Sequence, residues 1–161
     1  MGSIVQDLID HLTLETLDTN LFRGQSVYIG TNRVFGGQVL AQALAAAAMT
    51  VDEGDTHSLH AYFLRPGDPA APIIYEVDRA RDGRSYASRR VVAIQHGHQI
   101  LNLAASFHRP ETGFAHQAPM PDVPRPETLK DIAAWRREFM ERLPDVPAPR
   151  FMMDDGPFDF R

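Results

Sequence analysis

The sequence contains no cysteine. This absence excludes disulfide bonds, zinc sites built on thiolates and a cysteine nucleophile, and it is consistent with a reducing compartment. No apolar run reaches the roughly 20 residues that a membrane-spanning helix needs. The first ten residues also lack the basic and then apolar pattern of a signal peptide. We therefore expect a cytoplasmic protein without a membrane span.

Positive charge is also scarce. The 161 residues include 16 Lys and Arg against 21 Asp and Glu, which gives a formal net charge of -5. This balance argues against a nucleic-acid partner, although a local basic patch could still bind phosphate groups. The length is sufficient for one domain with a real hydrophobic core.

Proline and glycine are distributed unevenly along the chain. Nine of the twelve prolines, but only two of the eleven glycines, lie in the last 52 residues. A change of this kind indicates a domain boundary. We therefore predict a folded domain over 1–109 and a Pro-rich linker over 110–161.

The linker has two features of its own. An apolar stripe predicts a helix near 127–143, and Thr128 with Asp131 resembles a capping box at its start. The residues after this helix are expected to be unstructured or to begin a strand. Three aromatic residues there suggest docking onto a partner or onto another part of the protein; they are Phe151, Phe158 and Phe160.

The stretch that starts at Gly36-Gly37 predicts a buried helix. From Val39 to Val51 its only polar residues are Gln42 and Thr50. A helix that is apolar on every side must be enclosed by other structure. Alanine predominates in it, so neighbouring elements can pack very closely. This helix is the element around which we expect the domain to be built.

The segments around this helix have the patterns of short strands joined by tight turns. We predict a first helix over 3–11 and strands over 12–16, 21–25, 57–64, 73–80, 85–95 and 99–108. Gly83 can take a positive φ in one turn, and His96-Gly97-His98 closes a tight hairpin. The predicted fold class is α+β, with an antiparallel sheet wrapped around one central buried helix.

Four short segments follow one another along the chain in a distinctive order. They are LFRGQ at 21–25, VFGGQV at 34–39, HSLHAYFLRPGD at 57–68 and RDGRS at 81–85. Together they resemble the type II acyl-CoA thioesterases, the family typified by bacterial thioesterase II. The resemblance implies a hot-dog fold, in which a sheet wraps a central helix. It also implies hydrolysis of fatty acyl-CoA to free fatty acid and CoA by water, without a metal or another cofactor.

Members of this family resemble two fused hot-dog repeats and are nearly twice as long. The chain is similar to the first repeat and the linker that follows it. The resemblance places the family's carboxylate–polar–glutamine trio, which orients the hydrolytic water, in a second repeat. A non-catalytic hot-dog module that binds acyl-CoA, or pairs with a separate catalytic half, is the alternative. Because a single wrapped sheet leaves unpaired edges, we expect a second repeat or a homo-oligomer as partner.

The start of the central helix is the first candidate site. Thioester hydrolysis needs a positioned water, a group that takes its proton and donors for the developing oxyanion. The backbone N–H groups of Gly37 and Gln38 could be such donors, and the resemblance extends the candidate substrate-binding residues to Phe35 and Gly36. The alternative is that the glycines only permit close packing or a tight turn.

Histidines and one aspartate form a second group of candidates. His57 and His60 lie three apart in one predicted strand and should face opposite sides, so that one could face the helix. His57 is the candidate catalytic residue, against the simpler interpretation of a hydrogen-bonded sheet histidine. We expect no metal at His96 and His98, since too few ligands converge there. Asp68 follows a Pro-Gly turn and is expected to cap it.

Arginines are concentrated in one short region of this acidic chain, at positions 79, 81, 84, 89 and 90. Guanidinium groups suit the phosphates of CoA. The alternative is a solvated sheet edge whose charges discourage aggregation. Arg84 and Ser85, beside the turn at Gly83, are the candidate substrate-binding residues of this region.

Overall fold

The computed structural model describes residues 4–28, 31–142 and 157–161. The chain forms two compact units, residues 1–111 and 112–161. No helix within the described ranges is both long enough and apolar enough to cross a membrane.

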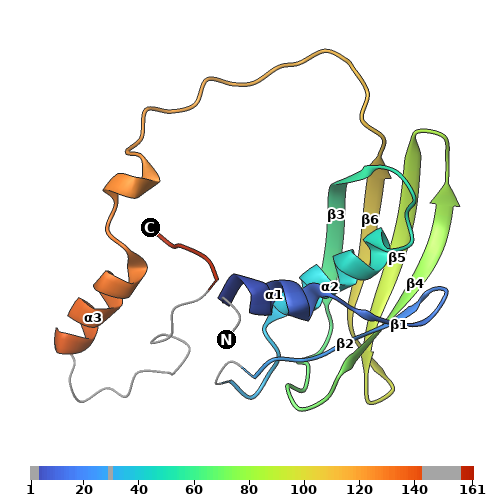
Figure 1. Cartoon of the computed structure of the whole chain (residues 1–161), viewed down its shortest axis with the longest axis horizontal. Coiled ribbons are helices and arrows are strands. Elements are labelled where there is room, and N and C mark those ends of the chain that lie inside the picture. Colours follow the sequence, from blue (N-terminus) through green and yellow to red (C-terminus); the bar gives the residue numbers. More distant parts are fainter. Residues whose placement is uncertain (1–3, 29–30, 143–156) are drawn as a thin grey trace. The chain divides into compact units, whose positions relative to one another are not determined.

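The first unit contains a six-stranded antiparallel sheet (Figure 1). Its strands are β1 (Glu15–Asp18), β2 (Leu21–Gly24), β3 (Asp55–Phe63), β4 (Ile73–Asp82), β5 (Tyr86–Gln95) and β6 (His98–His108). They lie in the order β1-β2-β4-β5-β6-β3. The strands β4, β5 and β6 form a meander at the centre, so β1 and β3 are the two edges of the sheet.

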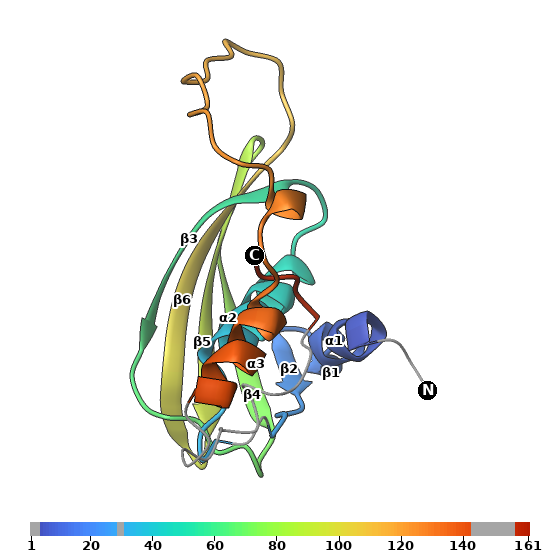
Figure 2. The ribbon, with the colours of Figure 1, turned by 90° about the vertical axis from the view of Figure 1, so that its left-hand side faces the viewer.

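Helix α2 (Gly36–Ala48) lies in the concave side of the curved sheet (Figure 2). Its Ala43, Ala46 and Ala47 are completely buried, and their small side chains let the helix axis come close to the strands. The predicted sheet around one central helix is therefore confirmed. The predicted enclosure on every side is wrong, because Leu44 is only half-buried and Met49 is 50% exposed.

Alternation along the strands gives the sheet two different faces. In β6, the buried residues Leu101, Leu103, Ala105 and Phe107 belong to the inner face, which α2 covers. Asn102, Ala104, Ser106 and His108 belong to the outer face and are more exposed. Which face a residue occupies decides whether it can reach the start of α2.

Gln42 connects α2 to the N-terminal helix, to β4 and to the segment after β2, although it is completely buried. Its Nε2 donates to the carbonyl oxygens of His11 (2.7 Å) and Gln25 (3.1 Å), and its Oε1 accepts from the Tyr75 hydroxyl (2.8 Å). Burial raises the pKa of Tyr75. Gly24 makes the room, since a Cβ there would lie 2.7 Å from Gln42 Oε1. All the polar atoms of this amide are thus satisfied, as burial requires.

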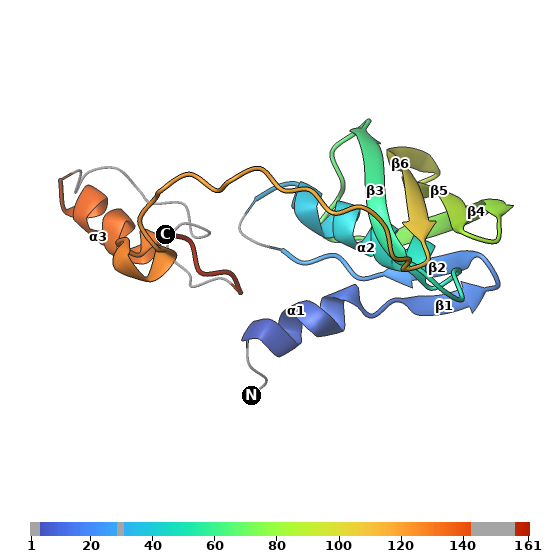
Figure 3. The same ribbon diagram turned by 90° about the horizontal axis from the view of Figure 1, so that it is seen from above.

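Helix α1 (Ile4–Leu12) contacts α2 and agrees closely with the predicted first helix (Figure 3). The strand predicted over 12–16 is present and pairs with β2, but its predicted start is wrong, because β1 begins only at Glu15. The reason is the helix end: both the backbone N–H and the hydroxyl of Thr13 donate to the carbonyl oxygen of Ile9 (3.1 and 3.0 Å). The last turn of α1 therefore extends into the residues that were predicted to start a strand.

Of the two turns predicted between β4, β5 and β6, one has the expected backbone conformation and the other does not. His96 (φ 49°) and Gly97 (φ 76°) form the predicted tight hairpin. Gly83 does not take the positive φ that was expected. Its role is a close approach instead: its N–H donates to the Tyr86 carbonyl (2.8 Å), and a Cβ at position 83 would lie 2.8 Å from that same oxygen.

Arg89 is buried with 2% of its surface exposed, so it fits neither interpretation of the arginine cluster, a phosphate-binding patch or a solvated sheet edge. Its Nε donates to Thr50 Oγ1 (2.8 Å) and its Nη2 to the Thr50 carbonyl (2.8 Å) and to Asp82. Its Nη1 donates to the carbonyls of Arg81 (3.0 Å) and Ser88 (2.9 Å). One guanidinium thus joins the chain just after α2 to the end of β4, where the pairing of β4 and β5 is irregular.

The second unit contains a short 3-10 helix (Pro126–Thr128) and helix α3 (Ile132–Arg142). A single helix starting near residue 127 is therefore wrong, and the cap is Asp131 rather than Thr128, because Asp131 Oδ1 accepts from Ala133 N–H (2.7 Å).

The end of the chain contacts the start of α3. The carbonyl of Phe160 accepts from Ile132 N–H (3.0 Å). The rings of Phe158 and Phe160 lie edge to face, 6.3 Å apart, and both side chains remain exposed. Phe151 lies outside the described residues, and docking of these rings onto a partner stays a prediction.

Candidate active site

The start of α2 leaves one predicted backbone donor open. The N–H of Gln38 already donates to the Phe35 carbonyl (3.0 Å), so it is not available to a ligand in this conformation. No described residue accepts a hydrogen bond from the N–H of Gly37. Phe35 precedes the helix without a side-chain cap. Among the residues that the structure describes, the Gly37 N–H in the first turn therefore has no acceptor, and a ligand oxygen could accept from it.

The side chain of Gln38 is engaged within the fold. Its Nε2 donates to the Gln25 carbonyl (2.9 Å), and its Oε1 accepts from Val27 N–H (3.2 Å). Gln42, one turn further along α2, also donates to the Gln25 carbonyl (3.1 Å). The two glutamines together hold the segment after β2 beside the helix. A direct contact of the Gln38 side chain with substrate stays a prediction.

Two phenyl rings border the glycines. A Cβ at Gly37 would lie 2.4 Å from Cε1 of Phe35, and a Cβ at Gly36 would lie 3.2 Å from the ring of Phe63. Both rings are more than half exposed, at 59% and 58%. The glycines therefore do permit close packing, as the alternative interpretation held, but they pack against exposed rings rather than against core.

A hollow of about 380 Å³ opens beside this point. Its lining residues are Arg33, Val34, Gly36, Val39, Phe63, Leu64, Arg65, Pro66, Gly67 and Ile100. The Val34 N–H donates to the Gly67 carbonyl (2.9 Å), which ties the segment before α2 to the loop after β3. Pockets of about 300 to 1,000 Å³ are typical of small-molecule sites.

Of the predicted site residues, only Gly36 lines this hollow. The lining residues that sequence reasoning missed include Arg33, Phe63 and Arg65. Two signals could have found them. Arg33 immediately precedes the VFGGQV segment, and Phe63 with Arg65 lies within HSLHAYFLRPGD. The sequence did not reveal that the VFGGQV and HSLHAYFLRPGD segments lie side by side in the fold.

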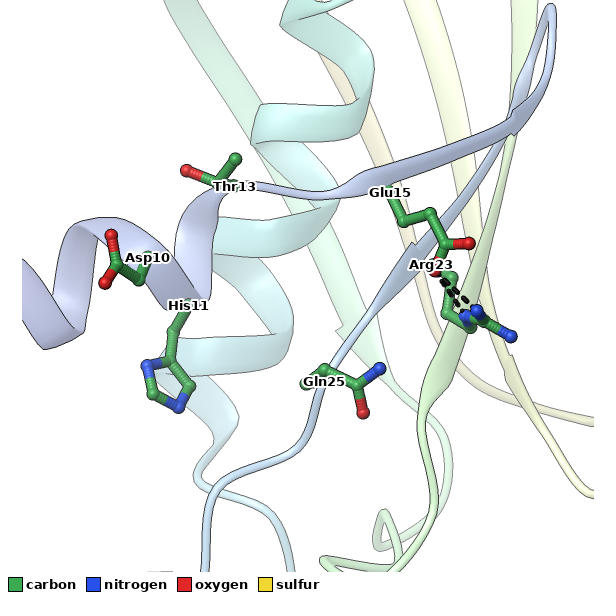
Figure 4. A pocket seen from close by; sticks show the side chains of 6 residues that line it. All are labelled: Asp10, His11, Thr13, Glu15, Arg23 and Gln25. Carbon is green, nitrogen blue, oxygen red and sulfur yellow. Dashed lines mark hydrogen bonds and ion pairs between the residues drawn. The ribbon is translucent and has the colours of Figure 1, made fainter.

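A second hollow of about 330 Å³ lies between α1 and the β1–β2 hairpin (Figure 4). Its lining residues are Asp10, His11, Thr13, Glu15, Arg23 and Gln25. Arg23 Nε donates to Glu15 Oε2 (2.8 Å), so the cation in this hollow is already neutralised. It has no apolar lining residue, and the carbonyl of its Gln25 already accepts from Gln38 and Gln42 of α2, so we assign no chemistry to it.

His57 is on the outer face of the sheet. Its Nε2 shares a hydrogen bond with Ser106 Oγ (2.9 Å), and its ring contacts those of Tyr86 and His108 (centroids 5.6 and 6.0 Å). His60 pairs with Ala104 and lies on that same face. The expectation that one of the two histidines faces the helix is therefore wrong.

The physical reason is the irregular pairing between Thr56 and Ser58, which breaks the alternation of β3. His57 has the geometry of a hydrogen-bonded sheet histidine, far from the open N–H of Gly37. No carboxylate among the described residues hydrogen-bonds to its ring. A catalytic role for His57 stays a prediction that the arrangement within this chain does not favour.

The structure does not bring Arg84 and Ser85 to the start of α2. They lie in the β4–β5 turn, and the Ser85 carbonyl accepts from Arg109 N–H (3.1 Å) just after β6. This is the end of the sheet where α2 finishes, as the contact between Arg89 and Thr50 shows. The length of a 13-residue helix, about 20 Å, therefore separates the two halves of the predicted substrate site.

Asp68 caps its turn as predicted. Its Oδ1 accepts from Ala70 N–H (2.8 Å), and its Oδ2 lies 3.0 Å from His96 Nε2. The backbone hydrogen bond from Ala70, followed by the contact with His96, holds the pKa of the Asp68 carboxyl below its ordinary value. No group of three or more His, Asp or Glu in the described part of the chain is arranged to hold a metal ion.

The fold defines the class of protein first. A protein of unknown function with a hot dog fold from Alicyclobacillus acidocaldarius superposes on the chain with a TM-score of 0.72 at 26% identity, over 95% of this chain and 53% of that one. The fold is therefore the hot-dog fold that the sequence resemblance implied.

The family follows from the sequence. The family model for the acyl-CoA thioesterase N-terminal domain matches residues 26–108, and the chain belongs to this family. The acyl-CoA thioesterase 2 of Haemophilus influenzae is 44% identical over 162 residues, which is 100% of this chain and 56% of that protein. The tesB protein of Mycobacterium avium subspecies paratuberculosis matches with a TM-score of 0.74 and 36% identity, over 78% and 50% of the two chains. The chain thus spans about half the length of these relatives.

Proposed function

We propose that this chain is the first hot-dog repeat of an acyl-CoA thioesterase, which hydrolyses fatty acyl-CoA to free fatty acid and CoA. The observation that carries the proposal is the N–H of Gly37 at the start of α2, which has no acceptor in the described part of the chain and lies beside a hollow large enough for part of a substrate. The names and identities of the relatives support the same reaction.

The proposed chemistry is attack of water on the thioester carbonyl carbon. The carbonyl oxygen becomes negatively charged in the transition state, and the Gly37 N–H with the positive end of the α2 dipole would stabilise it. The C–S bond then breaks, and CoA leaves as a thiol after protonation. Direct attack by water requires no metal or redox cofactor.

The proton acceptor for this water is not supplied by the hollow. None of its described lining residues is a carboxylate or a histidine. We therefore place the general base in a second hot-dog repeat, in the same polypeptide or in a separate subunit. The lack of a local base is also what favours the alternative function, a module that binds acyl-CoA without hydrolysing it.

Thiol release from a panel of acyl-CoAs tests this function. We expect the full-length gene product to release CoA at an enzymatic rate and the 161-residue chain alone to be folded but inactive. Turnover by the isolated chain would contradict the placement of the base in a second repeat. A full-length product that binds acyl-CoA but releases no thiol from any member of the panel would favour the non-catalytic module.

The partner is proposed to add to the edge of the sheet at β3. Eight of the nine residues of β3 are exposed, Tyr62 and Phe63 among them at 61% and 58%. The other edge, β1, is protected: it has four residues, an irregular register and the charged side chains of Glu15 and Asp18. A long edge strand with exposed aromatic residues invites pairing with another strand, whereas a short, charged one does not.

Light scattering checks this pairing. The 161-residue chain is expected to form a dimer in the absence of a second repeat, and Ala61→Pro, which introduces a residue without an N–H into the middle of β3, should weaken it. Ala118→Pro, outside the sheet, is the matched control. A monodisperse monomer of the unmodified chain would rule out self-pairing. The cytoplasmic location remains a separate prediction.

A further inference from the structure

The hollow beside the start of α2 combines an apolar lining with two guanidinium groups. Val34, Val39 and Ile100 form a buried floor, with at most 6% of each residue exposed. Phe63 and Leu64 form an apolar rim that is 58% and 45% exposed. A surface of this kind lowers its free energy when an apolar chain covers it.

The charges in the lining all have one sign. Arg33 and Arg65 are the only ionisable residues among the described residues that line the hollow, in a chain whose formal net charge is -5. Nη1 of Arg65 donates to the Gln99 carbonyl (2.8 Å), which fixes the side chain. Its other guanidinium nitrogens donate to no described residue. The Arg33 guanidinium has no hydrogen-bond or ion-pair partner among the described residues. Two arginines in the lining of one hollow, one without a partner among the described residues and one with a single acceptor, are suited to an anion with several oxygens.

We propose that this hollow binds an amphipathic anion, with the apolar chain on the Phe63–Leu64 rim and a carboxylate or phosphate on Arg33 and Arg65. The proposal rests on the proposed function for its two possible sources. One source is the free fatty acid that the reaction releases. The other is the phosphate-bearing arm of acyl-CoA. Both present the same chemistry, an anionic group joined to an uncharged chain.

Isothermal titration calorimetry on the 161-residue chain tests the proposal with octanoate, octyl phosphate, octanol and CoA. Octanoate and octyl phosphate are expected to bind at least about tenfold more tightly than octanol, since a charge-assisted hydrogen bond accounts for at least that factor. Arg33→Gln and Arg65→Gln should each weaken the binding of both anions about tenfold. Arg90→Gln, an exposed arginine on the outer face of the sheet, is the matched control and should leave both affinities unchanged.

Competition separates the two sources. Displacement of octyl phosphate by CoA would assign the guanidiniums to the phosphate-bearing arm, and octanoate binding that CoA does not affect would assign them to the fatty acid. Equal binding of octanol and octanoate, or anion binding that neither arginine variant weakens, would overturn the proposal. Arg33→Gln keeps the test decisive if Arg65→Gln unfolds, because no described residue depends on the Arg33 side chain.

The calorimetric result is independent of turnover. A full-length product that hydrolyses acyl-CoA but shows no arginine-dependent binding of anions would overturn this inference and leave the proposed function intact. Arginine-dependent binding of anions, together with a full-length product that releases no thiol, would support this inference and overturn the proposed function.

Discussion

Replacing Arg89 with alanine is expected to lower the free energy of unfolding of the first unit by about 3 kcal/mol or more. The guanidinium is the donor for the carbonyls of Thr50, Arg81 and Ser88. Its removal leaves these acceptors without a partner and creates a cavity between the end of α2 and the sheet. The cost therefore arises mainly from lost packing and from one buried and two partly buried carbonyls that lose their donor.

The ion pair with Asp82 is expected to contribute little to this loss. The Asp82 side chain is 61% exposed, and a pair with one solvated partner is typically worth less than about 1 kcal/mol. Asp82→Asn should therefore cost far less than Arg89→Ala. A large effect of Asp82→Asn would contradict this division and assign the stabilisation to the charge pair.

Denaturant unfolding of the two variants beside Arg90→Ala measures these effects. Arg90 is the next residue in β5 and has the same side chain, but it is exposed on the outer face. Its replacement should stay within about 0.5 kcal/mol. If Arg89→Ala unfolded at the same denaturant concentration as Arg90→Ala, the buried network would not be stabilising this fold.

Arg89 and Arg90 also show why the sequence located the strand correctly and misjudged the cluster. The strand over 85–95 was predicted from Tyr86, Val92 and Ile94 on one face, and β5 is present, but these three residues lie on the outer face. The alternation of β5 places Arg89 on the inner face. An arginine is expected to be buried only where hydrogen-bond acceptors satisfy its guanidinium group. Those acceptors are backbone carbonyls, which every residue carries, so the sequence does not mark them.

The part of the candidate site that a single segment of the sequence forms was predictable. The glycines at the start of α2 and the wrapped helix followed from the apolar run and from the four matching segments. The hollow did not, because its two walls meet through the hydrogen bond between Val34 and Gly67, 33 positions apart. His57 was misplaced for a local reason: the alternation rule assumes a regular strand, and β3 is irregular at Thr56–Ser58.

Replacing Gly37 with valine in the full-length gene product is expected to lower kcat/KM for acyl-CoA about 100-fold while leaving the fold intact. A Cβ at this position would lie 2.4 Å from Cε1 of Phe35, so the ring must move. The valine methyl groups and the displaced ring would then crowd the open N–H of Gly37. A displacement of about 1 Å in a catalytic group costs up to about 100-fold in rate, and loss of one oxyanion donor costs about 100- to 1,000-fold.

The stability of this variant decides between the two interpretations of the glycines. Gly37 has no positive φ, and valine is not a poorer helix former than glycine, so thermal unfolding should be nearly unchanged. Gly113→Val, at a glycine with no atom within 4 Å of its added Cβ, is the matched control for both measurements. Loss of folding together with activity would support close packing as the sole reason for the glycines. Wild-type thiol release by a folded Gly37→Val variant would remove the start of α2 from the reaction, and recovery of activity in Gly37→Val/Phe35→Ala would trace the loss to the ring rather than to the N–H itself.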